Sequence, residues 1–64
     1  MRHYSIGQKL QAIGTLTIRN DKITPADYHD IREWLALAGP GFNTPSLSDK
    51  ILERIEAVFQ IYFQ

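Results

Sequence analysis

The 64-residue chain contains no cysteine, only two histidines and no long hydrophobic run. Without cysteine it cannot form a disulfide or a thiolate metal site, and His3 and His29 alone are too few for a structural zinc site. No apolar run approaches the roughly 20 residues that a membrane-spanning helix needs. The first residues are not followed by an apolar segment either, so we expect no secretory signal, no membrane association and a cytoplasmic location.

The short length limits how much apolar surface the chain can bury. A 60-residue domain buries only about 60% of the surface that its unfolded chain exposes, so we expect residues 1–64 to form one domain that is marginal as a monomer. Small domains often gain stability from disulfides, a metal or oligomerisation. Because hydrophobic residues make up 44% of the chain and cysteine is absent, oligomerisation is the expected source of extra stability.

The clearest predicted element is a helix over residues 25–38. Thr24 is a good N-cap, Pro25 suits the first helical position, and Gly39 is a typical residue at a helix end. The apolar stripe at helical spacing consists of Tyr28, Ile31, Trp34, Leu35 and Ala38. Leu37 lies off this stripe, on the side that we expect to face water.

A second helix is predicted over residues 46–63, after a loop formed by GPGFNTPS. Thr44, or Ser46 with Asp49 three residues later, is expected to cap it. Its apolar residues cover more than half of the helix circumference: Leu47, Ile51, Leu52, Ile55, Val58, Phe59, Ile61, Tyr62 and Phe63. A surface helix needs an apolar stripe only about 100° wide. We therefore expect a second subunit to cover the remainder, because soluble monomers rarely expose large apolar patches.

The stretch TLTIR, residues 15–19, alternates polar and apolar side chains and is predicted to be a β-strand. The structure of residues 5–13 stays open between two alternatives. They form a helix that begins with a capping box of Ser5 and Gln8, or they extend the strand back to Lys9. We treat residues 1–14 as an N-terminal arm.

No second strand of similar quality is present, and a single strand leaves its backbone N–H and C=O groups unpaired. A symmetric dimer solves this problem, because the strand can pair with the same strand of a second copy. The predicted fold class is therefore mostly α with one short strand: a β-α-α protomer in an intertwined homodimer, with the strand paired across the two-fold axis. Alternatively, TLTIR is irregular or pairs with KIT across Asn20 and Asp21. The predicted dimer interface consists of Leu16, Ile18, Ile55, Val58, Phe59 and Tyr62.

The order strand–helix–helix over residues 15–63 resembles the ribbon-helix-helix family of DNA-binding proteins. That family reads the major groove with the outward side chains of a two-stranded ribbon, and Thr15, Thr17 and Arg19 match those positions. The resemblance also implies a phosphate at the N-terminus of the second helix, near NTPSLS. Here the strand does not lead directly into the helix, and the net charge is zero, whereas DNA-binding domains tend to be basic. A DNA-binding regulator is therefore the alternative function.

The chain also resembles a family of small early-region proteins of lambda-like temperate phages, encoded between the exonuclease and excisionase genes. Three segments carry the resemblance: TLTIR, ITPADYHDIREWLALAG and LSDKILERIEAVFQIYF. Members of that family have a similar length, with one strand and two helices that form a dimer. The resemblance implies a non-enzymatic regulator that favours lytic development through contact with a host protein in the bacterial cytoplasm.

Residues with catalytic or metal-binding chemistry are sparse. The best group is DYHDIRE, in which Asp30 and Glu33 flank His29. Side chains at this spacing more often form a solvated helix face, and no nucleophile–base pair, phosphate loop or metal motif accompanies them. We predict no catalytic residue, no metal site and no cofactor.

Trp34 is the only tryptophan, and two positions are open for it. In the first, it lies in the core or at the dimer interface. In the second, it forms the rim of a hydrophobic groove with Leu37, Phe42 and Phe63, because aromatic residues are favoured anchors where proteins meet. An amphipathic helix of a partner would fit such a groove. The predicted function is a regulatory protein-interaction module.

Overall fold

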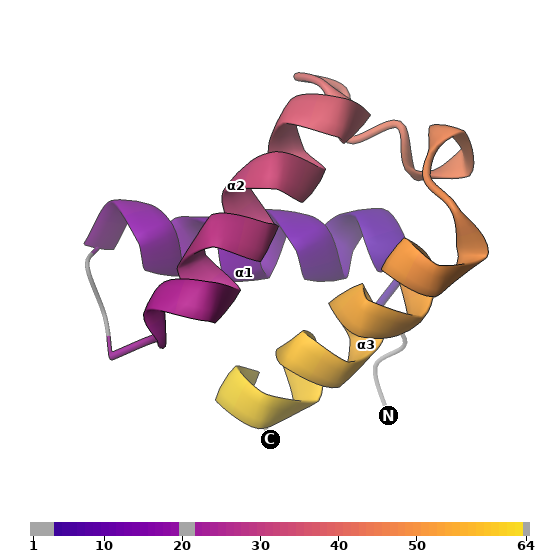
Figure 1. Cartoon of the computed structure of the whole chain (residues 1–64). Helices are drawn as coiled ribbons and strands as arrows, with labels where there is room; N and C mark the ends of the chain where they lie inside the picture. The colour runs from indigo at the N-terminus through magenta and orange to yellow at the C-terminus, as the bar shows by residue number, and fades with distance from the viewer. Residues whose placement is uncertain (1–3, 20–21, 64) are drawn as a thin grey trace.

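Three α-helices fold around a common core in the computed structural model, which describes residues 4–19 and 22–63. They are α1 (Ile6–Arg19), α2 (Pro25–Ala38) and α3 (Asp49–Phe63), and a 3₁₀ turn, η1 (Thr44–Ser46), lies between α2 and α3. In Figure 1, α2 crosses in front of α1, and α3 descends beside them to the C-terminus. α1 packs against both α2 and α3, and these two helices contact α1 more than they contact each other.

The structure corrects the predicted fold class. Residues 15–19 form the last turns of α1, and the part of the chain that the structure describes contains no strand. The β-α-α protomer and the ribbon paired across a two-fold axis are therefore wrong. A helix pairs the backbone groups of this segment internally, so no partner strand is needed. Asn20 and Asp21, the turn of the alternative hairpin, lie outside the described residues.

The alternating pattern of residues 15–19 led to a wrong prediction, because Leu16 fits both the strand period of two and the helical period. In the helix, it joins a buried series with Leu10, Ile13 and Thr17. Ile18, the other apolar residue of the supposed strand, points to solvent and is 83% exposed. One side chain left outside the core is a smaller penalty than an unpaired strand, so the helical alternative prevails.

The helical alternative for residues 5–13 is confirmed, together with its capping box. The Gln8 N–H donates to Ser5 Oγ at 3.2 Å, and the Ser5 N–H donates to Gln8 Oε1 at 2.8 Å. These two bonds satisfy backbone donors that the first turn of a helix otherwise leaves unpaired. α1 therefore includes residues 6–14 of the segment that we treated as an arm.

The helix predicted over residues 25–38 is confirmed at both ends. Thr24 Oγ1 accepts the Asp27 N–H at 3.1 Å, which caps the N-terminus. At the other end, the Gly39 N–H donates to the Leu35 carbonyl at 2.9 Å, and Gly39 has a φ of 79°. Glycine adopts this left-handed conformation without a steric penalty, so it ends the helix as expected.

The last helix begins at Asp49, later than predicted. The residues before it form η1, and the hydroxyl of Ser46 donates to the Asn43 carbonyl at 2.7 Å. The helix cap is Ser48 instead, whose Oγ accepts the Ile51 N–H at 3.3 Å. The predicted caps at the start of the helix are therefore wrong, because η1 occupies that segment.

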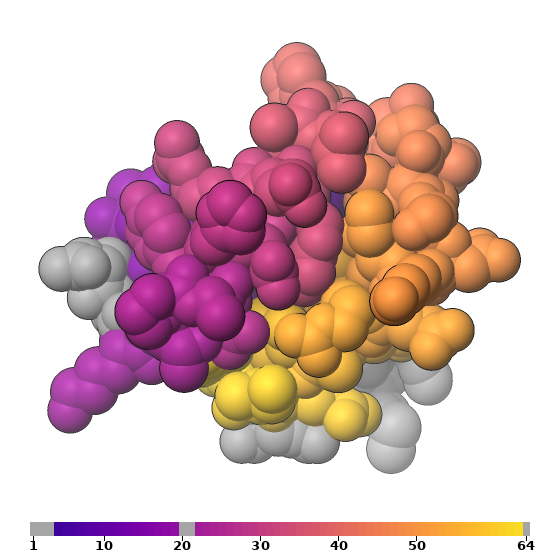
Figure 2. Space-filling view, viewed as in Figure 1, coloured from indigo at the N-terminus to yellow at the C-terminus, as the bar shows by residue number. Residues whose placement is uncertain are grey.

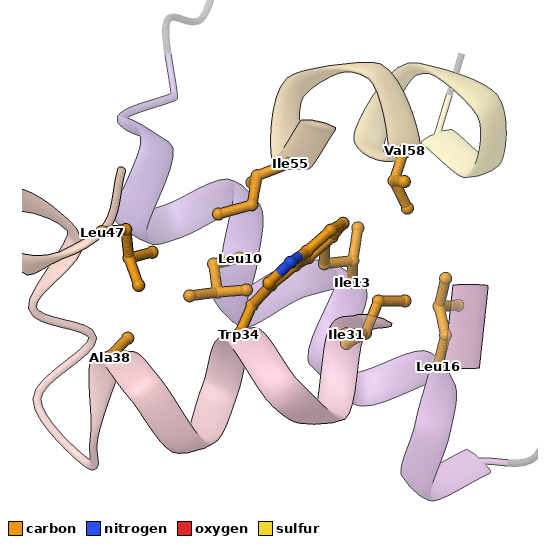
Figure 3. Close-up of a cluster of buried hydrophobic side chains, with 9 residues drawn as sticks. All are labelled: Leu10, Ile13, Leu16, Ile31, Trp34, Ala38, Leu47, Ile55 and Val58. Atoms are coloured by element: carbon orange, nitrogen blue, oxygen red, sulfur yellow. The ribbon is translucent and has the colours of Figure 1, made fainter. Parts of the chain in front are cut away.

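Nine buried apolar side chains form the core (Figure 3): Leu10, Ile13, Leu16, Ile31, Trp34, Ala38, Leu47, Ile55 and Val58. They come from all three helices and from the connection before α3. In Figure 3 the indole of Trp34 extends from α2 into the middle of the cluster. One chain thus covers most of the broad apolar face of α3 that we expected a second subunit to cover. Ile61 and Phe63 of α3 remain exposed.

α1 and α2 approach each other closely at Gly14, which is buried. A Cβ built on this glycine would lie 3.3 Å from Leu35 Cδ1 and 3.4 Å from Leu35 Cδ2. The absence of a side chain at this position therefore lets Leu35 pack directly on the backbone of α1.

Candidate protein-docking site

A hollow of about 360 Å³ lies between α1 and α3. Its lining residues are Tyr4, Gln8, Ala12, Phe59 and Phe63. We call it the aromatic groove. Gln8 and Ala12 lie four residues apart on α1, and Phe59 and Phe63 lie four residues apart on α3, so each pair shares one side of its helix. Tyr4, which precedes α1, completes the lining. Figure 2 shows the last turns of α3, in yellow, at the molecular surface.

Three aromatic rings form one wall of the aromatic groove. Phe59 and Phe63 stack with their ring centroids 5.0 Å apart, and Tyr4 meets Phe59 at 6.0 Å in a tilted arrangement. Aromatic pairs at these distances stabilise by about 0.5–1.5 kcal/mol beyond the area they bury. Phe59 also packs against the hydrophobic core, whereas Tyr4 and Phe63 are 47% and 45% exposed. The wall is therefore anchored at its middle and open to solvent at its ends.

Among the described residues, Lys9 and Glu56 form an ion pair beside the aromatic groove. Lys9 Nζ lies 3.0 Å from Glu56 Oε1, which links α1 to α3. The same ammonium lies 5.6 Å from the centroid of the Phe59 ring, where it is attracted to the electron-rich face. The polar lining residue Gln8 is uncharged. The five lining residues therefore carry no formal charge, and three of them are aromatic.

A polar network on the other side of α3 holds its last turn in place. The Tyr62 hydroxyl donates to Asp27 Oδ2 at 2.7 Å and accepts the Thr24 N–H at 3.3 Å. Arg54 lies 3.9 Å from the second oxygen of Asp27. The carboxylate also lies in the first turn of α2, where the helix dipole favours negative charge. These contacts join α3 to the start of α2.

The structure distributes the residues of the predicted dimer interface over several sites. Three of them lie in the core of the protomer itself: Leu16, Ile55 and Val58. Tyr62 is partly buried and belongs to the polar network, while Ile18 is exposed near the end of α1. Phe59 lines the aromatic groove.

The four residues of the predicted partner groove also lie in different surroundings. Trp34 is buried, which confirms the core alternative for this side chain. Phe42 is partly buried in the turn after α2, and Leu37 is 56% exposed on α2. Phe63 lines the aromatic groove, where its neighbour in the wall is Phe59.

The three residues of the DNA-binding alternative belong to α1. The Thr15 hydroxyl donates to the Ala12 carbonyl at 2.6 Å, and the Thr17 hydroxyl donates to the Gly14 carbonyl at 2.7 Å. Thr17 is buried, whereas Thr15 and Arg19 are exposed. Alternate residues of a helix do not share a face, so these side chains do not form the outward row that a ribbon would present.

The polar residues of DYHDIRE lie along α2, where His29 and Glu33 are exposed. Among residues 4–19 and 22–63, no group of three His, Asp or Glu side chains is placed to hold a metal ion. Within the same ranges, no helix has the length and apolar character to cross a membrane.

Sequence reasoning missed the α1 side of the aromatic groove. Phe59 and Phe63 were both singled out, although for different surfaces. Gln8 and Ala12 lie four positions apart, which places them on one side of a helix once this segment is known to be helical. Tyr4 precedes α1, so helical spacing does not identify it.

The chain was also compared with known proteins. A scan against protein-family models, a search of curated proteins and a search of solved structures each found no match. The function is therefore inferred from the geometry of the aromatic groove.

Proposed function

We propose that this chain is a non-enzymatic protein-interaction module that docks another polypeptide in the aromatic groove. The observation that carries the proposal is the position of Tyr4 and Phe63, which line an apolar hollow yet remain nearly half exposed. Aromatic side chains are enriched among the few residues that supply most of the binding energy of an interface. A partner that covered these two rings would bury apolar surface that water now contacts, which favours binding.

The shape of the hollow favours a polypeptide over a small molecule. Its volume of about 360 Å³ is near the lower end of the range for small-molecule pockets, which enclose most of their ligand. This hollow instead opens to solvent between two helices. A helix whose apolar side chains recur every three or four residues can lie across such a surface and cover it.

The phage resemblance supports a regulatory role for the module. It rests mainly on α2 and α3, since TLTIR is helical here and not a strand. A regulator that acts through contacts needs a complementary surface and no reacting group, which agrees with an apolar and neutral groove. The resemblance also implies contact with a host protein, and it assigns that contact to no particular surface.

Photochemical crosslinking tests the proposed function. Phe63→p-benzoylphenylalanine places a crosslinker in the aromatic groove, and the matched control Leu37→p-benzoylphenylalanine places it on another exposed apolar position, on α2. We expect irradiation of producing cells to yield a discrete covalent adduct with a polypeptide from position 63 and much less from position 37. Equal yields at both positions, or no adduct at 63, would refute docking in the groove.

A further inference from the structure

We infer that the last turn of α3, residues 60–63, opens while the core stays packed, and that the hydrogen bond from Tyr62 to Asp27 regulates docking in the aromatic groove by holding this turn closed. We call these residues the terminal turn. In the closed state the terminal turn places Phe63 in the groove, and in the open state Phe63 has left it. The inference rests on the proposed function, because it describes how the same groove is regulated.

The terminal turn contributes no fully buried side chain. Val58 is the last buried residue of α3, whereas Ile61 and Phe63 are 62% and 45% exposed. Tyr62 is partly buried and Gln60 is exposed. A segment with few buried apolar contacts opens at a lower free energy than the core does. The terminal turn can therefore open while Val58 and the rest of the core remain packed.

The helix end itself adds little stability to the terminal turn. The last four carbonyl groups of a helix have no partner within it, and a basic side chain in the last turn would offset their partial negative charge. α3 has no basic residue in its last turn. Contacts with other parts of the chain are therefore needed to keep the terminal turn closed.

These contacts are of two kinds, one polar and one aromatic. The Tyr62 hydroxyl donates to Asp27 Oδ2 at 2.7 Å and accepts the Thr24 N–H at 3.3 Å, both at the start of α2. Phe63 stacks on Phe59, and both rings line the aromatic groove. Because Tyr62 and Phe63 are adjacent in the chain, opening of the terminal turn breaks both kinds of contact. Loss of the polar contact therefore favours the state in which Phe63 has left the groove.

The hydrogen bond to Asp27 is strong enough to change the population of the two states. Because its acceptor is charged, removing the bond should make opening of the terminal turn roughly tenfold easier. An open state that starts at about 10% of the molecules would then reach about half of them. The affinity of a partner that needs the closed state falls in proportion to the fraction of molecules that stay closed.

Amide hydrogen exchange of the full chain, followed for each residue by NMR, tests the local opening. Tyr62→Phe keeps the ring that packs against the core and removes the hydroxyl. We expect it to speed exchange of the Tyr62 and Phe63 amides roughly tenfold. Tyr28→Phe, the matched control on α2, should leave their exchange unchanged.

A core variant shows whether the terminal turn opens separately from the core. Ile55→Val weakens the core, so the amides that exchange only by global unfolding should exchange severalfold faster. The amides of the terminal turn should not change, because Ile55 stays packed when only that turn opens. Equal acceleration of both groups by Ile55→Val, or unchanged exchange of the terminal turn in Tyr62→Phe, would overturn the inference.

Crosslinking tests the effect of the terminal turn on docking. Tyr4→p-benzoylphenylalanine places the crosslinker in the aromatic groove but outside α3. Asp27→Ala then removes the acceptor of the Tyr62 hydroxyl and leaves the terminal turn itself unchanged. We expect it to lower the yield of the adduct with a polypeptide about twofold or more. Asp30→Ala, the matched control on α2, should keep the full yield, and circular dichroism establishes that each variant is folded.

The two experiments separate failure of this inference from failure of the proposed function. An adduct whose yield is unchanged by Asp27→Ala, or lowered equally by Asp30→Ala, overturns the regulation and leaves docking in the groove supported. No adduct from position 4 or position 63 rejects docking and its regulation together. Hydrogen exchange needs no partner, so it decides in every case whether the terminal turn opens locally.

Discussion

The hydroxyl of Tyr62, near the end of α3, donates a 2.7 Å hydrogen bond to the carboxylate of Asp27 in the first turn of α2. The two residues are 35 positions apart in the chain. Because the acceptor is charged, this bond is among the stronger kinds in proteins. It ties the last turn of α3, which ends at Phe63, to the first turn of α2.

Tyr62→Phe should lower the free energy of unfolding by about 1–2 kcal/mol, because it removes the hydroxyl and leaves the Asp27 carboxylate without this donor. Chemical denaturation followed by Trp34 fluorescence measures the change. Tyr28→Phe is the matched control, since Tyr28 is exposed on α2 and a surface change of this kind is expected to stay within about 0.5 kcal/mol. Similar losses in both variants would contradict a specific role for the Tyr62 hydroxyl.

Ile55→Ala should destabilise the protein by about 2–5 kcal/mol, because it leaves a cavity among the fully buried side chains of the core. In a domain this small, such a loss is enough to unfold much of the population at room temperature. Ile61→Ala removes the same atoms from the same helix at a position that is 62% exposed, and should cost far less. Thermal unfolding of the two variants at equal concentration measures this difference. Equal melting temperatures would contradict the assignment of Ile55 to the core.

Gly14→Val should destabilise the protein by about 1–3 kcal/mol, since its methyl groups need the space that Leu35 occupies. The cost should fall when Leu35→Ala is introduced in the same chain, because the smaller side chain releases that space. A double-mutant cycle measured by urea unfolding gives the coupling energy. Additive effects would show that α1 and α2 do not depend on this contact.

Much of the helical structure could be predicted because its signals are local. Thr24 and Gly39 mark the ends of α2 by capping bonds between residues close in sequence. The apolar spacing of Ile31, Trp34 and Ala38 likewise identified side chains that the structure buries. The strand was predicted wrongly because five residues are too few to separate a period of two from a helical period when one residue, Leu16, satisfies both.

The sequence by itself determined that this is a small chain without disulfides, with α2 and α3 as helices and a surplus of apolar side chains. Composition and short-range patterns suffice for these properties, because caps and helix periods depend on neighbours a few residues away. Only the tertiary structure decided how that surplus is divided between core and surface. In the structure α1 packs against both α2 and α3. This packing buries Ile55 and Val58 and leaves Phe63 and Tyr4 at the surface of the aromatic groove. That division depends on which segments, far apart in the chain, pack against each other. Local sequence patterns do not specify this packing.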